Sequence, residues 1–152
     1  MSTSVVVDSV CEVIGFAGAA YNVGLTIVSY GRLPALIANH FNLRGEPTQW
    51  SPRALAWLTP VLSVAFFVLQ TALNPSIAPY FPGSPDAPTE FWMPVPLTAA
   101  ILVMTLIQRE ILTVALGAPR ADVRQFIFAM GLLLVAVGFV FVQATSSAIR
   151  SR

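Results

Sequence analysis

Residues 33–53 read LPALIANHFNLRGEPTQWSPR, and two long apolar segments flank this stretch. It holds the only histidine of the chain, His40, and three of the twelve prolines. Pro34 ends the apolar segment before it, because proline fixes φ and has no N–H to continue a helix. The run from Asn42 to Gly45 is typical of a turn, and Gly45 is free to take a positive φ. A loop of about 20 residues is usually either functional or disordered. Its prolines and turn residues restrict the backbone, so we predict an ordered hairpin between two helices.

The composition places this hairpin in a membrane protein. Hydrophobic residues make up 56% of the chain and charged residues only 10%, whereas a soluble domain carries about 25% charged residues. Four runs without charge occupy residues 13–31, 54–85, 91–108 and 125–149. Each is close to or above the roughly 20 apolar residues that a bilayer crossing needs. The net charge of +1, with no basic patch, gives no indication of nucleic-acid binding.

We therefore predict an all-α integral membrane protein that forms a single domain over residues 1–152. Its four transmembrane helices are expected over residues 11–30, 52–73, 95–116 and 125–147. Gly117 and Pro119 separate the last two helices. The proline-rich segment 74–93, which also carries aromatic residues, is expected to be an ordered loop at the membrane interface.

Local signals predict how these helices begin and bend. Ser51 followed by Pro52 is typical of a helix start, with the hydroxyl as N-cap and proline at the first helical position. Pro60 should kink the second helix and free a carbonyl for a neighbouring helix. Asp122, with Gln125 three residues later, resembles a capping box at the start of the fourth helix.

Three helices show one face of small and polar residues. Such a face is expected to point into the bundle, where small residues allow close approach and polar residues form hydrogen bonds between helices. Asn22 and Gln70 are the amide side chains on these faces, and they indicate either a polar site between helices or, more simply, interhelical hydrogen bonds. The three faces comprise Glu12, Gly15, Ala19, Asn22, Thr26 and Ser29; then Thr59, Ser63 and Gln70; and finally Gly131, Val135, Gly138, Val142 and Thr145.

Arg109 and Glu110 allow two interpretations. If the third helix continues past them, the charges lie within the apolar layer, which is a signal of a functional site. If the helix leaves the membrane near Gln108, or if the arginine snorkels, the charges reach the headgroups. We favour the second interpretation, although Thr98, Thr105 and Arg109 share one helical face.

The hairpin residues also resemble a family signature. Leu33-Pro34, Ile37, His40-Phe41-Asn42, Gly45-Glu46-Pro47, Trp50 and Arg53 are similar to the motif of a bacterial membrane-protein family of unknown function. That family forms the N-terminal part of the SdpI-type immunity proteins, which protect a cell from a toxin made by its own kin. The resemblance covers roughly residues 15–73, and Ala38 stands where the family usually has proline. It implies a location in the bacterial plasma membrane and a peptide toxin or another membrane protein as partner.

Two observations predict opposite orientations of the protein in the membrane. Six arginines flank the hairpin and the turn at Gly117, and by the positive-inside rule they place the hairpin in the cytoplasm. The family resemblance implies the reverse, with the motif outside. These arginines are Arg32, Arg44, Arg53, Arg109, Arg120 and Arg124.

The functional residues expected from the sequence lie mainly in the hairpin. His40, Asn42, Gly45, Glu46 and Trp50 are the candidate binding residues, and a structural His40 that donates hydrogen bonds to loop carbonyls is the simplest alternative. One histidine makes a poor zinc site, and no HExxH, GxSxG or CxxC motif occurs, so we expect no cofactor and no enzyme activity. The leading hypothesis is an SdpI-like immunity or signalling protein that binds a ligand or partner through the loop. The alternative is a structural accessory subunit of a larger membrane complex.

Overall fold

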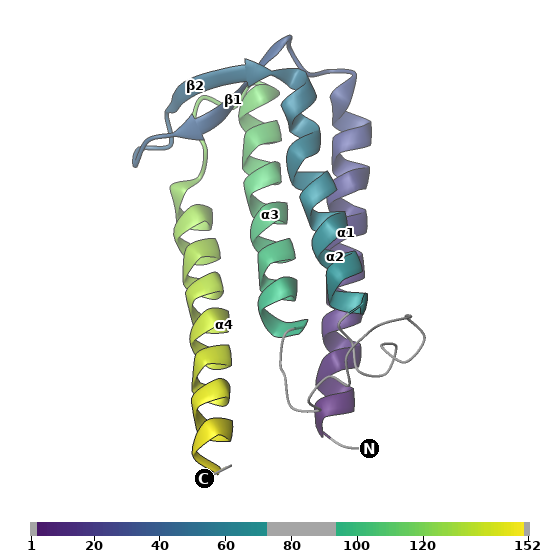
Figure 1. Cartoon of the computed structure of the whole chain (residues 1–152). Helices are drawn as coiled ribbons and strands as arrows, with labels where there is room; N and C mark the ends of the chain where they lie inside the picture. The colour runs from purple at the N-terminus through teal and green to yellow at the C-terminus, as the bar shows by residue number, and fades with distance from the viewer. Residues whose placement is uncertain (1–2, 73–93, 151–152) are drawn as a thin grey trace.

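The computed structural model describes residues 3–72 and 94–150. Four helices run side by side, and a β-hairpin lies across the end of the bundle opposite to the two chain termini (Figure 1). The predicted interfacial loop 74–93 lies outside the described residues. The elements are α1 (Thr3–Tyr30), β1 (Leu36–Phe41), β2 (Pro47–Pro52), the 3-10 helix η1 (Arg53–Trp57), α2 (Leu58–Ala72), α3 (Pro94–Ala115) and α4 (Val123–Arg150).

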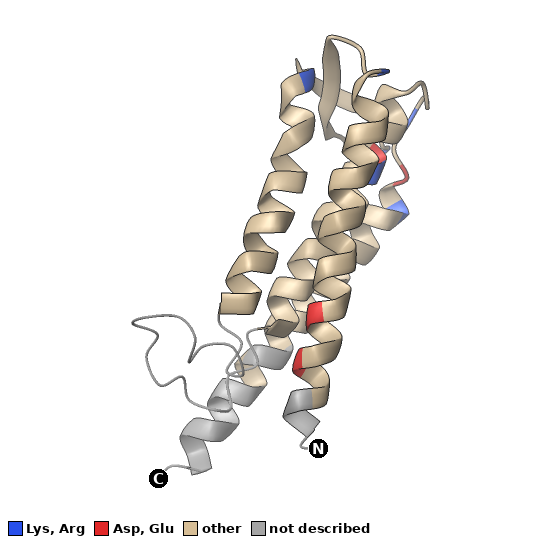
Figure 2. Ribbon diagram, turned by 90° about the vertical axis from the view of Figure 1, so that its right-hand side faces the viewer, with Lys and Arg blue, Asp and Glu red and all other residues tan. Residues whose placement is uncertain are grey.

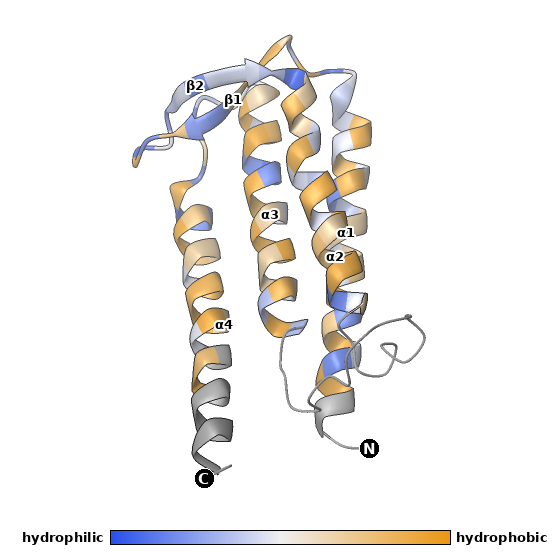
Figure 3. Cartoon of the chain, viewed as in Figure 1, coloured by the Kyte–Doolittle hydropathy of each residue, from blue (hydrophilic) through white to orange (hydrophobic). Residues whose placement is uncertain are grey.

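The helices have the length and composition of membrane spans. Three segments, Val6–Tyr30, Arg53–Ala72 and Pro94–Ala115, are long and apolar enough to cross a membrane, and α4 is apolar over Val123–Gly138. Charged residues gather near the hairpin end and near the start of α1 (Figure 2), and the helices between them are mainly apolar (Figure 3). The predicted helical architecture is therefore confirmed, and three helices are long and apolar enough to be membrane spans. A fourth crossing by α4 stays a prediction. The all-α description needs one correction, because β1 and β2 pair as a small antiparallel sheet.

Two predicted helix starts differ from the structure. The first helix begins at Thr3 rather than at residue 11. The second prediction, an N-cap at Ser51, is wrong: Ser51 pairs with Ile37 in the hairpin, and Pro52 has ψ 141°, which is extended. Because Ser51 and Pro52 belong to β2, the chain becomes helical only at Arg53, where η1 begins, and α2 starts at Leu58.

The helix α3 is the central element of the bundle and packs against α1, α2 and α4. The predicted inward faces of the first two helices are confirmed. On α1, Gly15, Ala19, Asn22, Thr26 and Ser29 are buried, and on α2 the buried residues include Thr59, Ser63 and Gln70.

The predicted inward face of the fourth helix is wrong. Gly131, Val135, Gly138 and Val142 are exposed, whereas Ala129 and Ala136 are buried where α4 packs against α3. Small residues occur on both sides of this helix, so a stripe of them does not by itself identify the packed side. Ala129 and Ala136 are also small, so this face allows close contact with α3 as well. The side chain of Thr145 lies outside the described part.

Ile37 and Ala38, the second and third residues of β1, are buried and attach the hairpin to the bundle. Ile37 packs with Leu33, Ala56 and Leu112 in one apolar cluster. Its neighbour Ala38 packs in a second cluster, which contains Val114 and Ala121. Because successive side chains of a strand point to opposite faces, these two residues anchor the hairpin from both faces.

Candidate binding site at the hairpin

The turn of the hairpin is organised by Asn42. Its Oδ1 accepts hydrogen bonds from the backbone N–H groups of Arg44 (2.8 Å) and Glu46 (3.0 Å). Its Nδ2 donates to Glu46 Oε2 (2.9 Å), and its backbone carbonyl accepts from the N–H of Gly45 (2.9 Å). Asparagine side chains commonly close turns in this way. The structure thus brings Asn42 and Glu46 together in an arrangement that holds the turn.

Gly45 joins the turn to the loop between α3 and α4. Its φ of 75° confirms the predicted left-handed conformation, and its carbonyl accepts a hydrogen bond from the N–H of Ala121 (2.9 Å). A Cβ atom at this position would collide with the carbonyl oxygen of Ala121. Arg120 and Glu46 form an ion pair beside this contact, with 3.2 Å between Nη2 and Oε1. The ion pair is largely exposed and adds little stability, so the backbone contact is the main attachment.

The two charges that interrupt α3 have different surroundings. The helix continues through Arg109 and Glu110 to Ala115. Both interpretations allow a continuous helix here, and the depth of the two charges in the membrane stays a prediction. Arg109 is exposed, in agreement with a snorkelling side chain. Glu110 is buried, and its Oε2 accepts a hydrogen bond from the N–H of Asp122 (2.7 Å).

This contact also modifies the predicted capping box. The Oδ1 of Asp122 accepts from the N–H of Arg124 (3.0 Å), which confirms Asp122 as the N-cap of α4. The N–H of Asp122, which a capping box would pair with the side chain of Gln125, is taken by Glu110 instead. The Oε1 of Gln125 is buried without a hydrogen-bond partner.

Three other hairpin side chains point into the surroundings. His40 is exposed, Leu43 at the tip is 94% exposed, and Trp50 on β2 is 53% exposed. Within residues 3–72 and 94–150, the imidazole of His40 makes no hydrogen bond, so the simplest alternative, a structural histidine, loses its support. His40 also stays apart from the hydrogen-bonded pair Asn42 and Glu46. In the same ranges, no group of three or more His, Cys, Asp or Glu residues could hold a metal ion.

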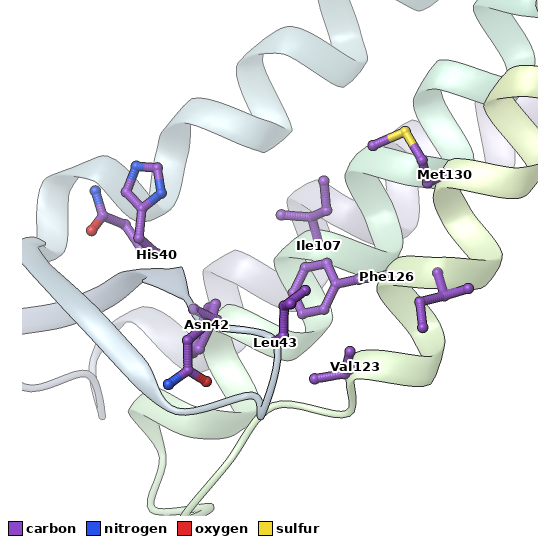
Figure 4. A pocket seen from close by; sticks show the side chains of 10 residues that line it. His40, Asn42, Leu43, Ile107, Val123, Phe126 and Met130 are labelled. Atoms are coloured by element: carbon purple, nitrogen blue, oxygen red, sulfur yellow. The ribbon is translucent and has the colours of Figure 1, made fainter.

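A groove of about 420 Å³ lies between the hairpin and the helices α3 and α4. Its polar end is formed by β1 and the turn, where His40 and Asn42 lie (Figure 4). Its other walls are apolar side chains of the two helices, namely Ile107, Val123, Phe126, Ile127 and Met130. The hairpin end thus combines polar groups with the apolar side chains of Phe41 and Leu43, and the helix end is apolar.

A buried polar cluster lies below the hairpin, between α1, α2 and α3. Gln108 is its centre: Nε2 donates to Thr26 Oγ1 (2.7 Å) and to the carbonyl of Ala56 (2.8 Å), and Oε1 accepts from Thr59 Oγ1. The carbonyl of Ala56 is available because Pro60, four residues later, has no N–H to donate. The prediction that Pro60 frees a carbonyl for a neighbour is thus confirmed, although Pro60 lies in the first turn of α2 rather than in its middle.

The two predicted intramembrane amides are both buried. Asn22 Nδ2 donates to Ser63 Oγ (2.8 Å). Gln70 Oε1 accepts from Thr98 Oγ1 (3.1 Å) near the opposite end of the bundle. These contacts are hydrogen bonds between helices, which is the simpler of the two alternatives for this pair. Asn22 Oδ1 and Gln70 Nε2 have no hydrogen-bond partner among residues 3–72 and 94–150.

Sequence reasoning missed Gln108 and grouped Arg109 with Thr98 and Thr105 on one helical face. A signal was present, because Thr98, Ile101, Thr105 and Gln108 recur at spacings of three and four, as one helical face requires. Thr98, Ile101 and Gln108 are buried, whereas Arg109 is exposed. The spacing therefore indicates Gln108, rather than the charged Arg109, as the inward residue of α3.

A comparison with protein families gives one match. A family model described as a domain of unknown function, DUF1648, matches residues 17–64. This segment contains the second half of α1, the whole hairpin, η1 and the start of α2. No match was found among curated proteins or among solved structures.

Proposed function

We propose that this chain is an integral membrane binding protein, without enzyme activity, whose hairpin recognises a peptide toxin or another membrane protein at the membrane surface. The observation that carries this proposal is the contrast within the hairpin. Its backbone is fixed to the bundle at Ile37, Ala38 and Gly45, whereas His40, Leu43 and Trp50 remain exposed. Exposed side chains on a rigidly held loop are the usual arrangement of a recognition site.

The resemblance to SdpI-type proteins supports a role in toxin immunity or envelope signalling in a bacterial plasma membrane. The matched family segment contains the hairpin, but its description names no activity. An immunity role requires binding rather than catalysis, and the hairpin offers exposed apolar and imidazole groups for it. Leu43 and Trp50 would supply apolar contacts, and His40 would supply a hydrogen bond.

The test pairs a stability assay with a binding assay. In His40→Ala, the melting curve of the purified protein should be unchanged, because the imidazole has no structural partner. A photo-crosslinking residue at position 43 should capture a peptide or protein partner in cells, and His40→Ala should abolish that capture. The same crosslinker at Val28, which is exposed on α1, is the control. Retained capture at position 43 together with a lowered melting temperature would contradict the proposal and restore the structural histidine.

The alternative function, a structural accessory subunit, has support from α4. Gly131 and Gly138 lie on its exposed face, and a Cβ atom at either would meet nothing within 4 Å. A face with small residues allows a helix of another subunit to approach closely. Purification in mild detergent should then yield a stoichiometric larger partner, and Gly138→Leu should release it. Loss of the partner in His40→Ala instead would favour the hairpin as the contact.

A further inference from the structure

We propose that the groove between the hairpin and the helices α3 and α4 is a binding site for one anionic phospholipid. The headgroup would lie against the hairpin, and an acyl chain would lie between the two helices. This ligand differs from the partner proposed for the exposed hairpin side chains, and the inference does not depend on that partner.

The depth of the groove is the first argument. Ile107 lies eight residues before the end of α3, and Met130 lies seven residues after the start of α4. At 1.5 Å per residue, the apolar end lies about 10–12 Å below the helix ends. The groove thus extends from the hairpin, at the surface of the spans, into the layer that lipid chains occupy.

The opening of the groove is the second argument. Ile127 is 69% exposed and Met130 is 56% exposed, so the apolar end is open at the side of the bundle. An apolar space does not hold water, and in a bilayer the molecules that reach a lateral opening are lipids. A volume of about 420 Å³ is within the range of sites for small ligands.

The polar end favours an anionic headgroup. Arg44 follows Leu43 and Arg124 follows Val123, both of which line the groove, and both arginine side chains are exposed. The backbone N–H groups of Arg44 and Arg124 are hydrogen-bonded to Asn42 and Asp122, which fixes the main chain of both residues beside the groove. From there a flexible arginine side chain can reach the headgroup at the rim of the groove.

The acidic groups nearby are already engaged. The carboxylate of Glu46 is paired with Arg120, and Asp122 caps α4.

Asn39 also lines the groove, and its Oδ1 is buried without a hydrogen-bond partner among the described residues. A hydroxyl group of the headgroup would supply the missing donor. Phosphatidylglycerol combines this hydroxyl with a negative charge.

The experiment uses the full chain in a neutral detergent. The protein is titrated with phosphatidylglycerol and, separately, with phosphatidylcholine of the same acyl chains, while its melting temperature and the lipids bound in native mass spectrometry are recorded. We expect phosphatidylglycerol to raise the melting temperature at lower concentration and to bind at one molecule per chain. Arg44→Gln and Arg124→Gln should each weaken its apparent affinity about fivefold, the usual contribution of one basic residue near an anionic lipid.

Two further variants test the apolar end. Met130→Trp fills it and should remove the lipid-dependent shift, while the melting temperature without lipid stays the same. Val137→Trp, at an exposed position of α4 outside the groove, is the matched control and should keep the shift. Equal binding of the two lipids by the wild-type chain would refute the proposal, whatever the variants show. A similar shift with glycerol 3-phosphate alone would also refute it, since the acyl chain would then play no part.

Discussion

Replacement of Gln108 by methionine tests the polar cluster most directly. Methionine has a similar length and volume, so the change removes hydrogen bonds and leaves the packing of α3 nearly intact. The wild-type side chain makes hydrogen bonds with Thr26, Thr59 and the carbonyl of Ala56. Hydrogen bonds between membrane helices contribute about 0.6 kcal/mol each on average.

The carbonyl of Ala56 makes the expected loss larger. Pro60 cannot donate to it, so removal of Gln108 leaves a buried carbonyl without its partner, at about 1–3 kcal/mol. With the two lost hydroxyl bonds, we expect the free energy of unfolding to fall by about 2–4 kcal/mol. Reversible unfolding in mixed detergent and dodecyl sulfate micelles, followed by circular dichroism, measures this quantity. Thr113→Val is the control, because that exposed hydroxyl bonds only to its own helix, at the carbonyl of Arg109.

A double-mutant cycle isolates the carbonyl. Pro60→Ala restores an N–H four residues after Ala56, which gives that carbonyl a partner within the helix. Gln108→Met should therefore be less destabilising in the Pro60→Ala background, by about 1 kcal/mol or more. An equal effect in both backgrounds would refute the link between Pro60 and Gln108. A loss below about 0.5 kcal/mol for Gln108→Met alone would refute the structural importance of the cluster.

Two further predictions concern glycines. Gly45→Val should lower the free energy of unfolding by about 1–3 kcal/mol, since it strains a left-handed residue and displaces the carbonyl of Ala121. Membrane insertion, measured by protease protection, should be retained. An unchanged melting curve would contradict the attachment of the hairpin through Gly45 and Ala121. Gly15→Leu should destabilise the bundle by about 1–3 kcal/mol, because its Cβ would already lie 3.0 Å from Gln70 Oε1. Gly138→Leu, on the outward face of α4, should melt like the wild type, and equal losses in the two leucine variants would contradict the assignment of faces.

The helical part of the fold could be predicted because its signals are local. Charge-free runs define apolar segments. The spacing of Asn22 and Thr26 on α1, and of Thr59 and Ser63 on α2, identifies the inward faces of these two helices without knowledge of the partners, although the same reasoning gave the wrong face for α4. The left-handed Gly45 was predictable for the same reason, since turn chemistry depends on a few adjacent residues. These are properties that each segment has by itself.

The errors arose where a residue has two local preferences and a distant contact selects one. Ser51-Pro52 fits a helix start as well as the end of a strand, and pairing with Ile37 and Leu36 selects the strand. Asp122 fits a capping box with Gln125, but Glu110 occupies its N–H. The residues adjacent to each position give no indication of these distant partners.

The candidate site shows the same limit. The hairpin was identified as the organising element, but the roles within it were not separated. Asn42 holds the turn, whereas the more conspicuous His40 is free in the described part of the chain. The groove was not foreseen, because the residues that form it come from β1, α3 and α4 and share no short motif.

The matched family segment is also structurally incomplete without the rest of the chain. Residues 17–64 contain the hairpin, yet the carbonyl of Gly45 is paired with Ala121, and Ile37 packs on Leu112. The carbonyl of Ala56 likewise depends on Gln108. A buried carbonyl without a partner is unfavourable, and more so in a membrane, where water cannot replace the partner. The segment therefore takes its observed form only against α3 and the start of α4, so any binding function of the hairpin belongs to the four-helix assembly as a whole.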